Sequence, residues 1–498
     1  MRKSVYLGID FGTTVLKICA FDSATGHILA HASENLKVRH SANGGREQRI
    51  PSINRIFSDL VHEIQIQLGA RWNRVESIGL AAQGGSTLIA DRKTGKPLTS
   101  MILWNDGRTH GYTETLAEEI PLQYRRKHLF CDSLPAGLGR LLWLSETRPG
   151  LFHENHIHVG AGEYLYFTLT NIWRQDPGNA IQIGSYHAAK KRLDSFLFRR
   201  IAVPLSFVAS LRRGHETAPL SLQGARLLGL PEGIPVAGPY IDQESGFLSA
   251  ARVSKRPLHC SLGTAWVGNF VLPDETTGFS PTQLVLPSPL GRGRLIVQPL
   301  LTGNTAWDWG LRTFADNNLR TAIAKATRIF SKSLLPRDGL VAFPWFSQPN
   351  PLYSSSHGAG GFFGLDAQTT PDDQLRALAA GMAFELRRVF GSLIESDRVD
   401  SIVLGGGASK GTYFQEMIAG LFSPVPVFRQ MEEEFSTARG TIFSFDPNVS
   451  QTKSRLICPP DSALLMKIRH HYDYYLKTIS RLYPLCGTGK AFSFAERE

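Results

Sequence analysis

The chain contains two short apolar segments that each run into a Gly-Thr turn and continue as a second apolar segment. The pattern occurs in "YLGIDFGTTVLKICAFD", residues 6–22, and again in "LHCSLGTAWVGNF", residues 258–270. β-Branched and apolar residues on both sides of the turn predict strands, and the link Gly12-Thr13-Thr14 suits a tight β-hairpin. Because each half of the chain has one such hairpin, the sequence predicts a duplicated α/β architecture.

The tip of the first hairpin has the chemistry of a phosphate-binding turn. Gly12 lets the backbone approach a ligand closely, while the following amides and the hydroxyls of Thr13 and Thr14 are donors without a strand partner. Asp10 ends the first strand near the same tip, where its carboxylate would repel phosphate unless a cation lay between them. Magnesium with its water shell is the natural mediator. A plain hairpin with a turn-capping aspartate explains the same residues equally well.

Length and composition restrict the class of protein. A chain of 498 residues predicts two large domains, and none of its windows is apolar enough to span a membrane. The N-terminal apolar run lacks a small-residue cleavage site, so it reads as a strand and not as a signal peptide. The five cysteines show no C-x-x-C spacing, which argues against a zinc site or a disulfide framework and fits a reducing cytoplasm.

The formal net charge of +11 raises the question of a nucleic-acid partner. Lysine and arginine are dispersed along the chain, and no basic stripe is interleaved with aromatic residues. The sequence therefore argues against nucleic acid. It favours either a general positive field that helps anionic nucleotides approach, or a solvated surface without a specific role. Association into a homodimer stays open.

Predicted strands and helices alternate along the chain, as an α/β protein requires. Strands are expected at residues 77–82 and 87–90, in addition to the two hairpins. The expected helices are Ile53–Leu68, Gly137–Glu146, Asp242–Ala251, Leu375–Ile394 and Ala463–Leu482. The polar basic stretch "RVSKRP" separates a helix from a new strand, so we place the domain boundary there and expect domains at residues 1–252 and 253–498.

Three further stretches carry polar or glycine-rich chemistry. Asp242 follows a Gly-Pro turn at the start of a predicted helix, where it could act as a catalytic base or as a first-turn cap. The run "LGGGASKG", residues 404–411, removes side chains that would keep a flat ring or a ribose from the backbone. The first half also gathers donors and acceptors suited to the hydroxyl groups of a sugar or polyol, namely Gln83, Trp104, Asn105, Asp106 and Arg108.

Together these stretches resemble the FGGY carbohydrate kinase family of the sugar kinase, actin and heat-shock chaperone superfamily. The resemblance runs in order through "GIDFGTT", "ILWNDGRT", "DQESG", "SLGT", "LTGNTAWDWGLR", "DGLVAFPWF", "GGFFGL" and "LGGGASKG". It implies an α/β fold of two ribonuclease-H-like (actin-like ATPase) domains flanking a deep cleft. The sugar would lie deep in the cleft, and MgATP would enter from the opposite side.

The resemblance also implies roles for individual residues. Asp10 would hold the magnesium ion, and Asp242 would accept the proton of the attacking hydroxyl while the γ-phosphoryl group is transferred. The residues expected to bind ATP are Gly12, Thr13, Thr14, Lys17, Gly263, Thr264, Gly303, Asn304, Gly406, Gly407 and Ala408. The residues expected to bind the sugar or polyol are Gln83, Gly84, Trp104, Asn105, Asp106, Asp242 and Gln243.

The identity of the sugar depends on the stretch "AAQGGST". It lacks the Gln-Met-His-Gly pattern of pentulose kinases and the Arg-Glu pair that follows this glutamine in glycerol kinases. Gly84 and Gly85 should therefore leave a wider pocket for a ketose or polyol of five to seven carbons, such as a pentulose. Near the C-terminus, "EEFSTARGTIFSF" resembles the family's Ala-Gly-rich helix only loosely.

Two alternatives stay open. One is a descendant of the same fold that binds sugar or nucleotide as a sensor, against which the presence of both Asp10 and Asp242 argues. The other is a serine hydrolase, because "GASKG" fits the G-x-S-x-G nucleophile elbow. Its residues would be Ser409, with Asp446 or Asp461, His470 or His471, and an oxyanion loop at His357. This second alternative leaves the first 350 or so residues without a role.

Overall fold

The computed structural model describes residues 4–263, 265–277, 279–280, 282–300, 302–346, 360–446, 449 and 453–482. The chain divides into two compact units. The first comprises Met1–Ser249, Leu284–Leu295 and Phe435–Thr452, and the second comprises Ala250–Gln283, Ile296–Glu434 and Lys453–Glu498. The chain first crosses between the units close to the boundary expected from sequence, but two later segments group with the first unit. The assignment of separate functions to residues 1–252 and 253–498 stays a prediction.

A six-stranded mixed sheet forms the centre of the first unit, with the strand order β14-β15-β6-β1-β2-β3. Strand β1 is antiparallel to β2 and parallel to β6, and β6 is parallel to β15. The first predicted hairpin is confirmed, because Gly12-Thr13-Thr14 joins β1 to β2. The strands are β1 (Val5–Phe11), β2 (Val15–Asp22), β3 (Ile28–Asn35), β6 (Val75–Ala82), β14 (Thr217–Pro219) and β15 (Pro235–Ile241).

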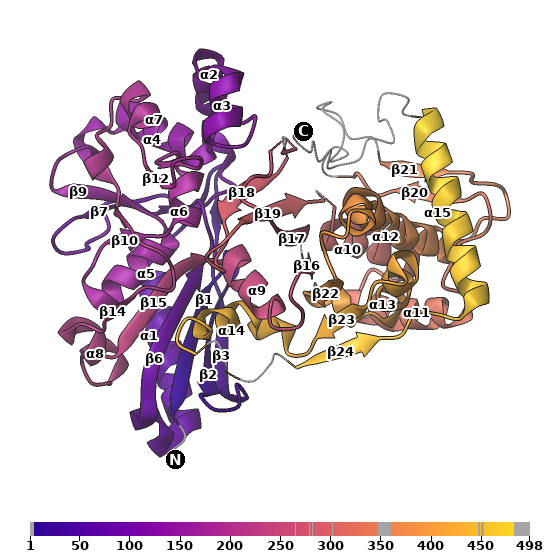
Figure 1. The fold of residues 1–498 in the computed structure, drawn as a ribbon, viewed down its shortest axis with the longest axis horizontal. Coiled ribbons are helices and arrows are strands. Elements are labelled where there is room, and N and C mark those ends of the chain that lie inside the picture. The colour runs from indigo at the N-terminus through magenta and orange to yellow at the C-terminus, as the bar shows by residue number, and fades with distance from the viewer. Residues whose placement is uncertain are drawn as a thin grey trace. The chain divides into compact units, whose positions relative to one another are not determined.

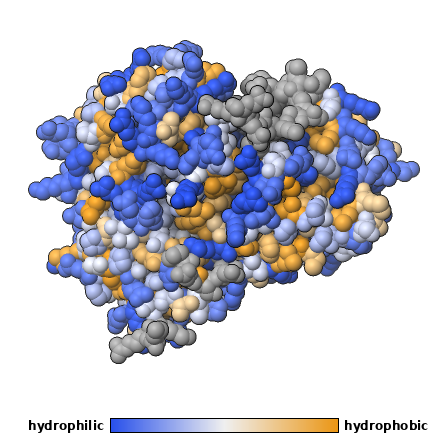
Figure 2. Space-filling view, viewed as in Figure 1, coloured by the Kyte–Doolittle hydropathy of each residue, from blue (hydrophilic) through white to orange (hydrophobic). Residues whose placement is uncertain are grey.

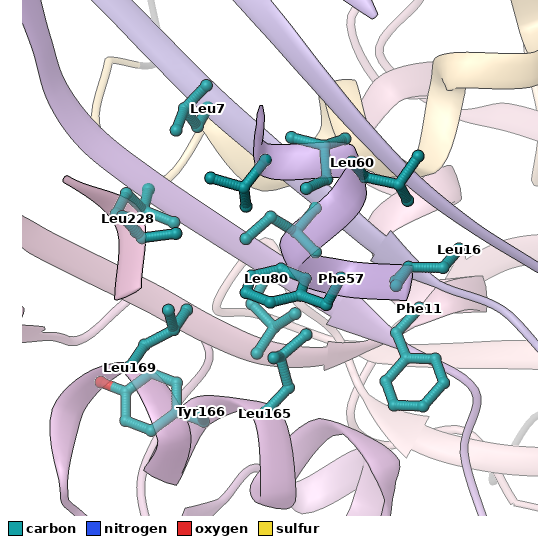
Figure 3. Close-up of a cluster of buried hydrophobic side chains, with 14 of the residues drawn as sticks. Leu7, Phe11, Leu16, Phe57, Leu60, Leu80, Leu165, Tyr166, Leu169 and Leu228 are labelled. Carbon is teal, nitrogen blue, oxygen red and sulfur yellow. The ribbon is translucent and has the colours of Figure 1, made fainter. Parts of the chain in front are cut away.

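Helices α1 (Ile50–Leu68), α5 (Ala161–Thr170) and α8 (Leu222–Leu228) cover one face of this sheet. Strand β1 alternates as a two-sided strand should, with Leu7 and Phe11 in the core beneath these helices and Tyr6 in a cluster on the other face. Figure 3 shows sheet and helix side chains meeting in this core. Burial of each large apolar side chain stabilises the folded state by about 1.5–3 kcal/mol. The labelled residues are Leu7, Phe11, Leu16, Phe57, Leu60, Leu80, Leu165, Tyr166, Leu169 and Leu228.

Helix α14 (Ser436–Ile442) packs against β1 and β6 although it lies far from them in sequence. In Figure 1 it lies beside the indigo strands of the first unit. Two glycines allow this approach. A Cβ on Gly8 would stand 2.3 Å from the carbonyl oxygen of Ala438, and one on Gly79 would stand 2.3 Å from Oγ1 of Thr441. Because real Cβ atoms do not approach so closely, the helix needs glycine at both strand positions.

The rest of the first unit includes a second apolar core, to which α2, α4 and α7 contribute residues. Its helices are α2 (His110–Glu119), α3 (Leu122–His128), α4 (Ala136–Thr147), α6 (Pro177–Gln182), α7 (Phe196–Arg200) and α9 (Asp242–Ala250). The shorter strands are β4 (Arg39–His40), β5 (Arg46–Gln48), β7 (Leu88–Asp91), β8 (Met101–Ile102), β9 (His156–Val159), β10 (Arg174–Gln175), β11 (Tyr186–His187), β12 (Arg192–Leu193), β13 (Ser210–Leu211) and β18 (Leu284–Pro287).

The second unit repeats the hairpin motif. Strand β16 is antiparallel to β17 and parallel to β22, and β22 is parallel to β23, which is antiparallel to β24. Its strands are β16 (Pro257–Leu262), β17 (Trp266–Leu272), β20 (Val341–Phe343), β21 (Gly361–Phe363), β22 (Ser401–Gly405), β23 (Val427–Gln430) and β24 (Ser454–Ile457), and β19 (Arg294–Pro299) begins in the first unit. Its helices are α10 (Asn304–Gly310), α11 (Leu319–Lys332), α12 (Pro371–Glu395), α13 (Thr412–Phe422) and α15 (Ser462–Leu482).

All five helices expected from sequence are present, as α1, α4, α9, α12 and α15, and the two additional strands appear as β6 and β7. The duplicated α/β architecture is thus confirmed. Among the described residues, no helix is both long enough and apolar enough to cross a membrane. In Figure 2 hydrophilic residues cover much of the visible face, with smaller hydrophobic areas among them.

Candidate active site

Three polar side chains lie at the carboxyl ends of neighbouring parallel strands of the first unit. Asp10 lies near the end of β1, Gln83 directly follows β6, and Asp242 directly follows β15. Parallel strands end at one edge of a sheet, so this topology brings the three residues to the same edge. The crevice outside the carboxyl ends of such strands is where ligands of α/β proteins bind.

Asp10 is only 6% exposed and faces Lys17 across the hairpin, with Lys17 Nζ 3.5 Å from Asp10 Oδ2. Burial raises the pKa of Asp10, and the charge of Lys17 opposes that rise. Within the described ranges, His, Cys, Asp and Glu form no group of three or more that could hold a metal. Mg²⁺ is commonly held by one or two carboxylates together with substrate phosphates and water. A single buried carboxylate beside a Gly-Thr turn fits an ion that arrives with phosphate.

Asp242 is the first residue of α9, and the backbone amide of Gln243 donates to its Oδ1 at 2.8 Å. Burial of the carboxyl, followed by the negative charge of Asp10, raises the pKa of Asp242 to about 7. A group with a pKa near the working pH is well suited to exchange protons. Asp242 therefore has the position and the titration of a general base.

The first Gly-Thr turn is tied to the other polar residues by a chain of hydrogen bonds. Thr13 Oγ1 donates to Gln83 Oε1 at 3.0 Å and accepts from Trp104 Nε1 at 3.1 Å. Gln48 Nε2 donates to the Thr13 carbonyl at 2.7 Å. The Thr13 hydroxyl thus joins the expected phosphate turn to the expected sugar-binding residues, whereas Thr14 is exposed. Gln48 was missed in the sequence analysis, because nothing local links residue 48 to this turn.

The stretch Trp104-Asn105-Asp106 contains three different environments. Trp104 is 51% exposed, which leaves its ring accessible. Asn105 Oδ1 is buried without a hydrogen-bond partner among the described residues, so it can accept a bond from a ligand hydroxyl or a water. Asp106 is buried, and its oxygens accept bonds from Arg108 and from the backbone amide of Arg46. Its carboxylate is used to hold the turn.

Arg140 of α4 makes hydrogen bonds to the loops that carry these residues. It is 1% exposed and donates to Thr87 Oγ1 at 3.0 Å, to the Trp104 carbonyl at 3.2 Å, and to the Gly85 carbonyl. Burial lowers its pKa to about 10. Since a guanidinium offers five donors in a rigid fork, one buried side chain can join the Gly84-Gly85 turn to the Trp104 loop. Sequence analysis missed Arg140, which looks like an isolated charge in an apolar helix.

The glycine-rich residues expected to contact nucleotide come together in the second unit. Gly263 follows β16, Gly303 precedes α10, and Gly406 follows β22. The Asn304 amide donates to the Gly263 carbonyl at 3.1 Å, and a Cβ on Gly407 would lie 3.7 Å from Asn304 Nδ2. Gly406 has φ of +81°, and a Cβ there would meet the Leu262 backbone at 2.7 Å. Three stretches far apart in sequence therefore form one glycine-lined corner. Thr264 lies outside the described residues.

Ala408 and Ser409 form the turn after this corner. Ser409 is fully buried, and its Oγ donates to the Gly406 carbonyl at 2.7 Å. His471 lies instead 3.1 Å from Asp338, and His357 is outside the described residues. A buried hydroxyl committed to a backbone carbonyl cannot attack a substrate, so the geometry does not support the serine hydrolase alternative.

Two family models together match most of the chain. The N-terminal domain of the FGGY family of carbohydrate kinases matches residues 5–249, and the C-terminal domain of the same family matches residues 260–443. The chain belongs to the FGGY family of carbohydrate kinases. The predicted family membership, the α/β fold of two actin-like domains and the kinase activity are therefore confirmed.

Individual FGGY relatives differ in the substrates that their names give. The chain is 24% identical to a probable L-xylulose kinase of Haemophilus influenzae, over 96% of this chain and 99% of the relative. Its fold is similar to the crystal structure of a xylulose kinase from Brucella ovis, with 21% identity, a TM-score of 0.85 and coverage of 97% and 100%. It is also similar to Plasmodium falciparum glycerol kinase with ADP, with 17% identity, a TM-score of 0.81 and coverage of 97% and 98%.

Proposed function

We propose that this FGGY kinase transfers the γ-phosphoryl group of ATP to a hydroxyl of a ketose or polyol of five to seven carbons, such as a pentulose. The observation that carries the proposal is the shared strand edge in the first unit, where Asp10, Gln83 and Asp242 lie at the carboxyl ends of neighbouring parallel strands. The similar glycerol kinase with ADP supports ATP as the donor. The probable L-xylulose kinase supports a pentulose as the acceptor.

In this proposal, Asp242 orients the acceptor hydroxyl and takes its proton as the oxygen attacks the γ-phosphorus. The bond between that phosphorus and the β-γ bridging oxygen breaks, and ADP leaves. Asp10 would hold Mg²⁺, which would neutralise charge on the phosphates, and Lys17 lies beside Asp10. Gly12, Thr13 and Thr14 approach the phosphates on the first unit. On the second unit, the corner formed by Gly263, Gly303, Asn304, Gly406 and Gly407 serves the nucleotide. Ala408 in the following turn and Thr264 are assigned to the nucleotide as well.

The sugar contacts follow from the same geometry. Trp104 offers an exposed ring and Asn105 an unsatisfied acceptor, while Gln83 stands at the strand edge near Asp242. Gln243, which follows Asp242 in the first turn of α9, is assigned to the sugar as well. Asp106 contributes by holding the loop, because its oxygens are already bonded to Arg108 and Arg46.

The decisive experiment compares Asp242→Asn with the unchanged protein in an ADP-release assay with MgATP. The panel contains glycerol, xylitol, D-xylulose, L-xylulose, L-ribulose and sedoheptulose. We expect at least one pentulose to be turned over by the unchanged protein. The variant should lose about 10²- to 10⁴-fold in kcat, because an amide cannot accept the proton.

Asp59→Asn is the matched control, since Asp59 is an exposed residue of α1 in the same unit. It should retain full activity. Normal turnover by Asp242→Asn would refute the assignment of the base. If the unchanged protein turned over none of the sugars but bound one of them, the sensor alternative would be favoured.

A further inference from the structure

Gln182 lies against the two glycines of the Gly84-Gly85 turn. A Cβ built on Gly84 would stand 2.1 Å from Gln182 Nε2 and 3.0 Å from its Oε1, and one on Gly85 would stand 2.7 Å from Oε1. A Cβ on Gly85 would also lie 3.4 Å from the Cβ of Trp104. The space that these glycines leave is therefore occupied by a polar side chain from another element. Our expectation of a wider pocket at this point is wrong for that reason.

The helix that carries Gln182 is held in place at both ends. Asp176 caps α6 by accepting from the Asn179 amide at 2.9 Å, and Asn179 Nδ2 donates to the Pro239 carbonyl of β15 at 3.2 Å. On the other side, a Cβ on Gly137 of α4 would stand 2.7 Å from the Gln182 carbonyl oxygen. Because β15 leads directly to Asp242, α6 fixes Gln182 relative to the strand that presents the proposed base.

The amide of Gln182 retains most of its hydrogen-bonding capacity. Across the described ranges, its side chain makes a single hydrogen bond, a long donation from Nε2 to the Gly178 carbonyl at 3.3 Å. The residue is half-buried, so its Oε1 and its second N–H remain accessible. An amide can donate two hydrogen bonds and accept two, which matches hydroxyl and carbonyl groups of a sugar.

We propose that Gln182 is a specificity-determining residue, whose amide contacts the sugar in place of side chains absent at Gly84 and Gly85. This inference rests on the proposed function and deepens it. The ligand class is an open-chain ketose or polyol long enough to reach from Asp242 to the Gly84-Gly85 turn. The glycines are needed so that the amide can lie there, and the sequence pattern of the turn alone therefore does not set the size of the site.

Two substitutions separate hydrogen bonding from volume. Gln182→Leu keeps most of the volume but removes the donors and acceptors, and it should lower kcat/KM for the best sugar by about tenfold or more, mainly through KM, because a sugar hydroxyl loses its partner. Gln182→Ala opens space and should shift the preference towards longer sugars. Both variants should keep the KM for ATP within about twofold. Their melting temperatures should equal that of the unchanged protein, because the hydrogen bond lost from Gln182 is long and the residue is half-buried.

Gln123→Leu is the matched control, because Gln123 is an exposed residue of α3 in the same unit. It should change none of these quantities. Direct calorimetric binding of the same sugars keeps the inference apart from the proposed function. Weaker sugar affinity in Gln182→Leu supports the inference even if no phosphoryl transfer is seen, whereas unchanged affinity and unchanged sugar KM in both Gln182 variants overturn it while leaving measured kinase activity intact.

Discussion

At the scale of single residues, the protonation of Asp242 has the largest consequence. Its pKa is raised to about 7 by burial and by Asp10, so below that pH the carboxyl already carries the proton that it should accept. We expect kcat/KM to fall as pH is lowered, with a midpoint above the ordinary range of an aspartate, because burial is the larger cause of the raised pKa and persists when Mg²⁺ neutralises Asp10. The measurement is a pH profile of kcat/KM for the best sugar at saturating MgATP.

The same titration also affects the free energy of unfolding, but in the opposite direction: low pH lowers activity and favours the folded state. A carboxyl whose pKa is raised by folding stabilises the folded state at low pH, and this contribution is lost as pH rises from about 4 to about 7. Asp242→Asn should therefore gain stability relative to the unchanged protein across that window and hold the gain above it. Two results together would contradict the raised pKa. One is a fall of kcat/KM only near pH 4, and the other is a difference in melting temperature between Asp242→Asn and the unchanged protein that stays constant from about pH 4 to about pH 7.

The candidate site residues that could be predicted from the sequence are those with a local signature. Asp10 lies near the end of a predicted strand and Asp242 begins a predicted helix, and the parallel strands β1 and β15 then bring them to one edge of the sheet. Gln48, Arg140 and Gln182 have no such signature, because their roles depend on the tertiary position of β5, α4 and α6. The same limit explains why the two glycines at residues 84 and 85 suggested empty space, since a sequence does not show which distant side chain fills it.

At the scale of elements, periodicity was sufficient for long helices and for hairpins but not for short docked segments. Helices α1, α12 and α15 are long and amphipathic, and both Gly-Thr hairpins combine strand-forming residues with a turn. Helix α14 has only seven residues, so it gives almost no periodic signal. Its packing against β1 was not predicted, although the glycines that permit it are visible in the sequence.

The approach of α14 to β1 leads to a stability prediction. Gly8→Ala would place a Cβ 2.3 Å from the Ala438 carbonyl oxygen, and because that atom is backbone, α14 must shift. We expect a loss of about 1–3 kcal/mol, the usual effect of overpacking a tight interface. Chemical denaturation followed by circular dichroism measures it.

Gly150→Ala provides the comparison, since a Cβ there would meet no atom of the described residues within 4 Å. That variant should unfold at the same denaturant concentration as the unchanged protein. If Gly8→Ala proved equally neutral, the close contact between α14 and β1 would be incorrect.

At the scale of the whole molecule, the first unit is not continuous in sequence. Phe435–Thr452 groups with it, and its apolar residues bury a cluster on the sheet face opposite α1. The members of that cluster are Tyr6, Cys19, Phe21, Ala81, Tyr240, Leu248, Phe435, Ala438, Ile442, Phe443 and Val449. A fragment ending at Ser249 would expose the part of this cluster that belongs to the sheet.

We therefore expect residues 1–249 alone to bind a hydrophobic dye and to lack a cooperative thermal transition. The same fragment joined by a flexible linker to residues 435–452 should bind less dye and melt at a higher temperature, because each large side chain that is covered again contributes about 1.5–3 kcal/mol. A scrambled version of residues 435–452 is the control. Equal behaviour of the two fusions would contradict the role of this segment.

The discontinuity also bears on how the polypeptide is made. Domains generally fold as units, from the N-terminus, while the ribosome is still adding residues. Here the sheet that emerges first lacks its covering helix until α14 has been synthesised, after most of the second unit. The nascent chain carries an uncovered apolar surface from the completion of β15 until α14 emerges, and we expect chaperones that bind growing polypeptides to recognise it.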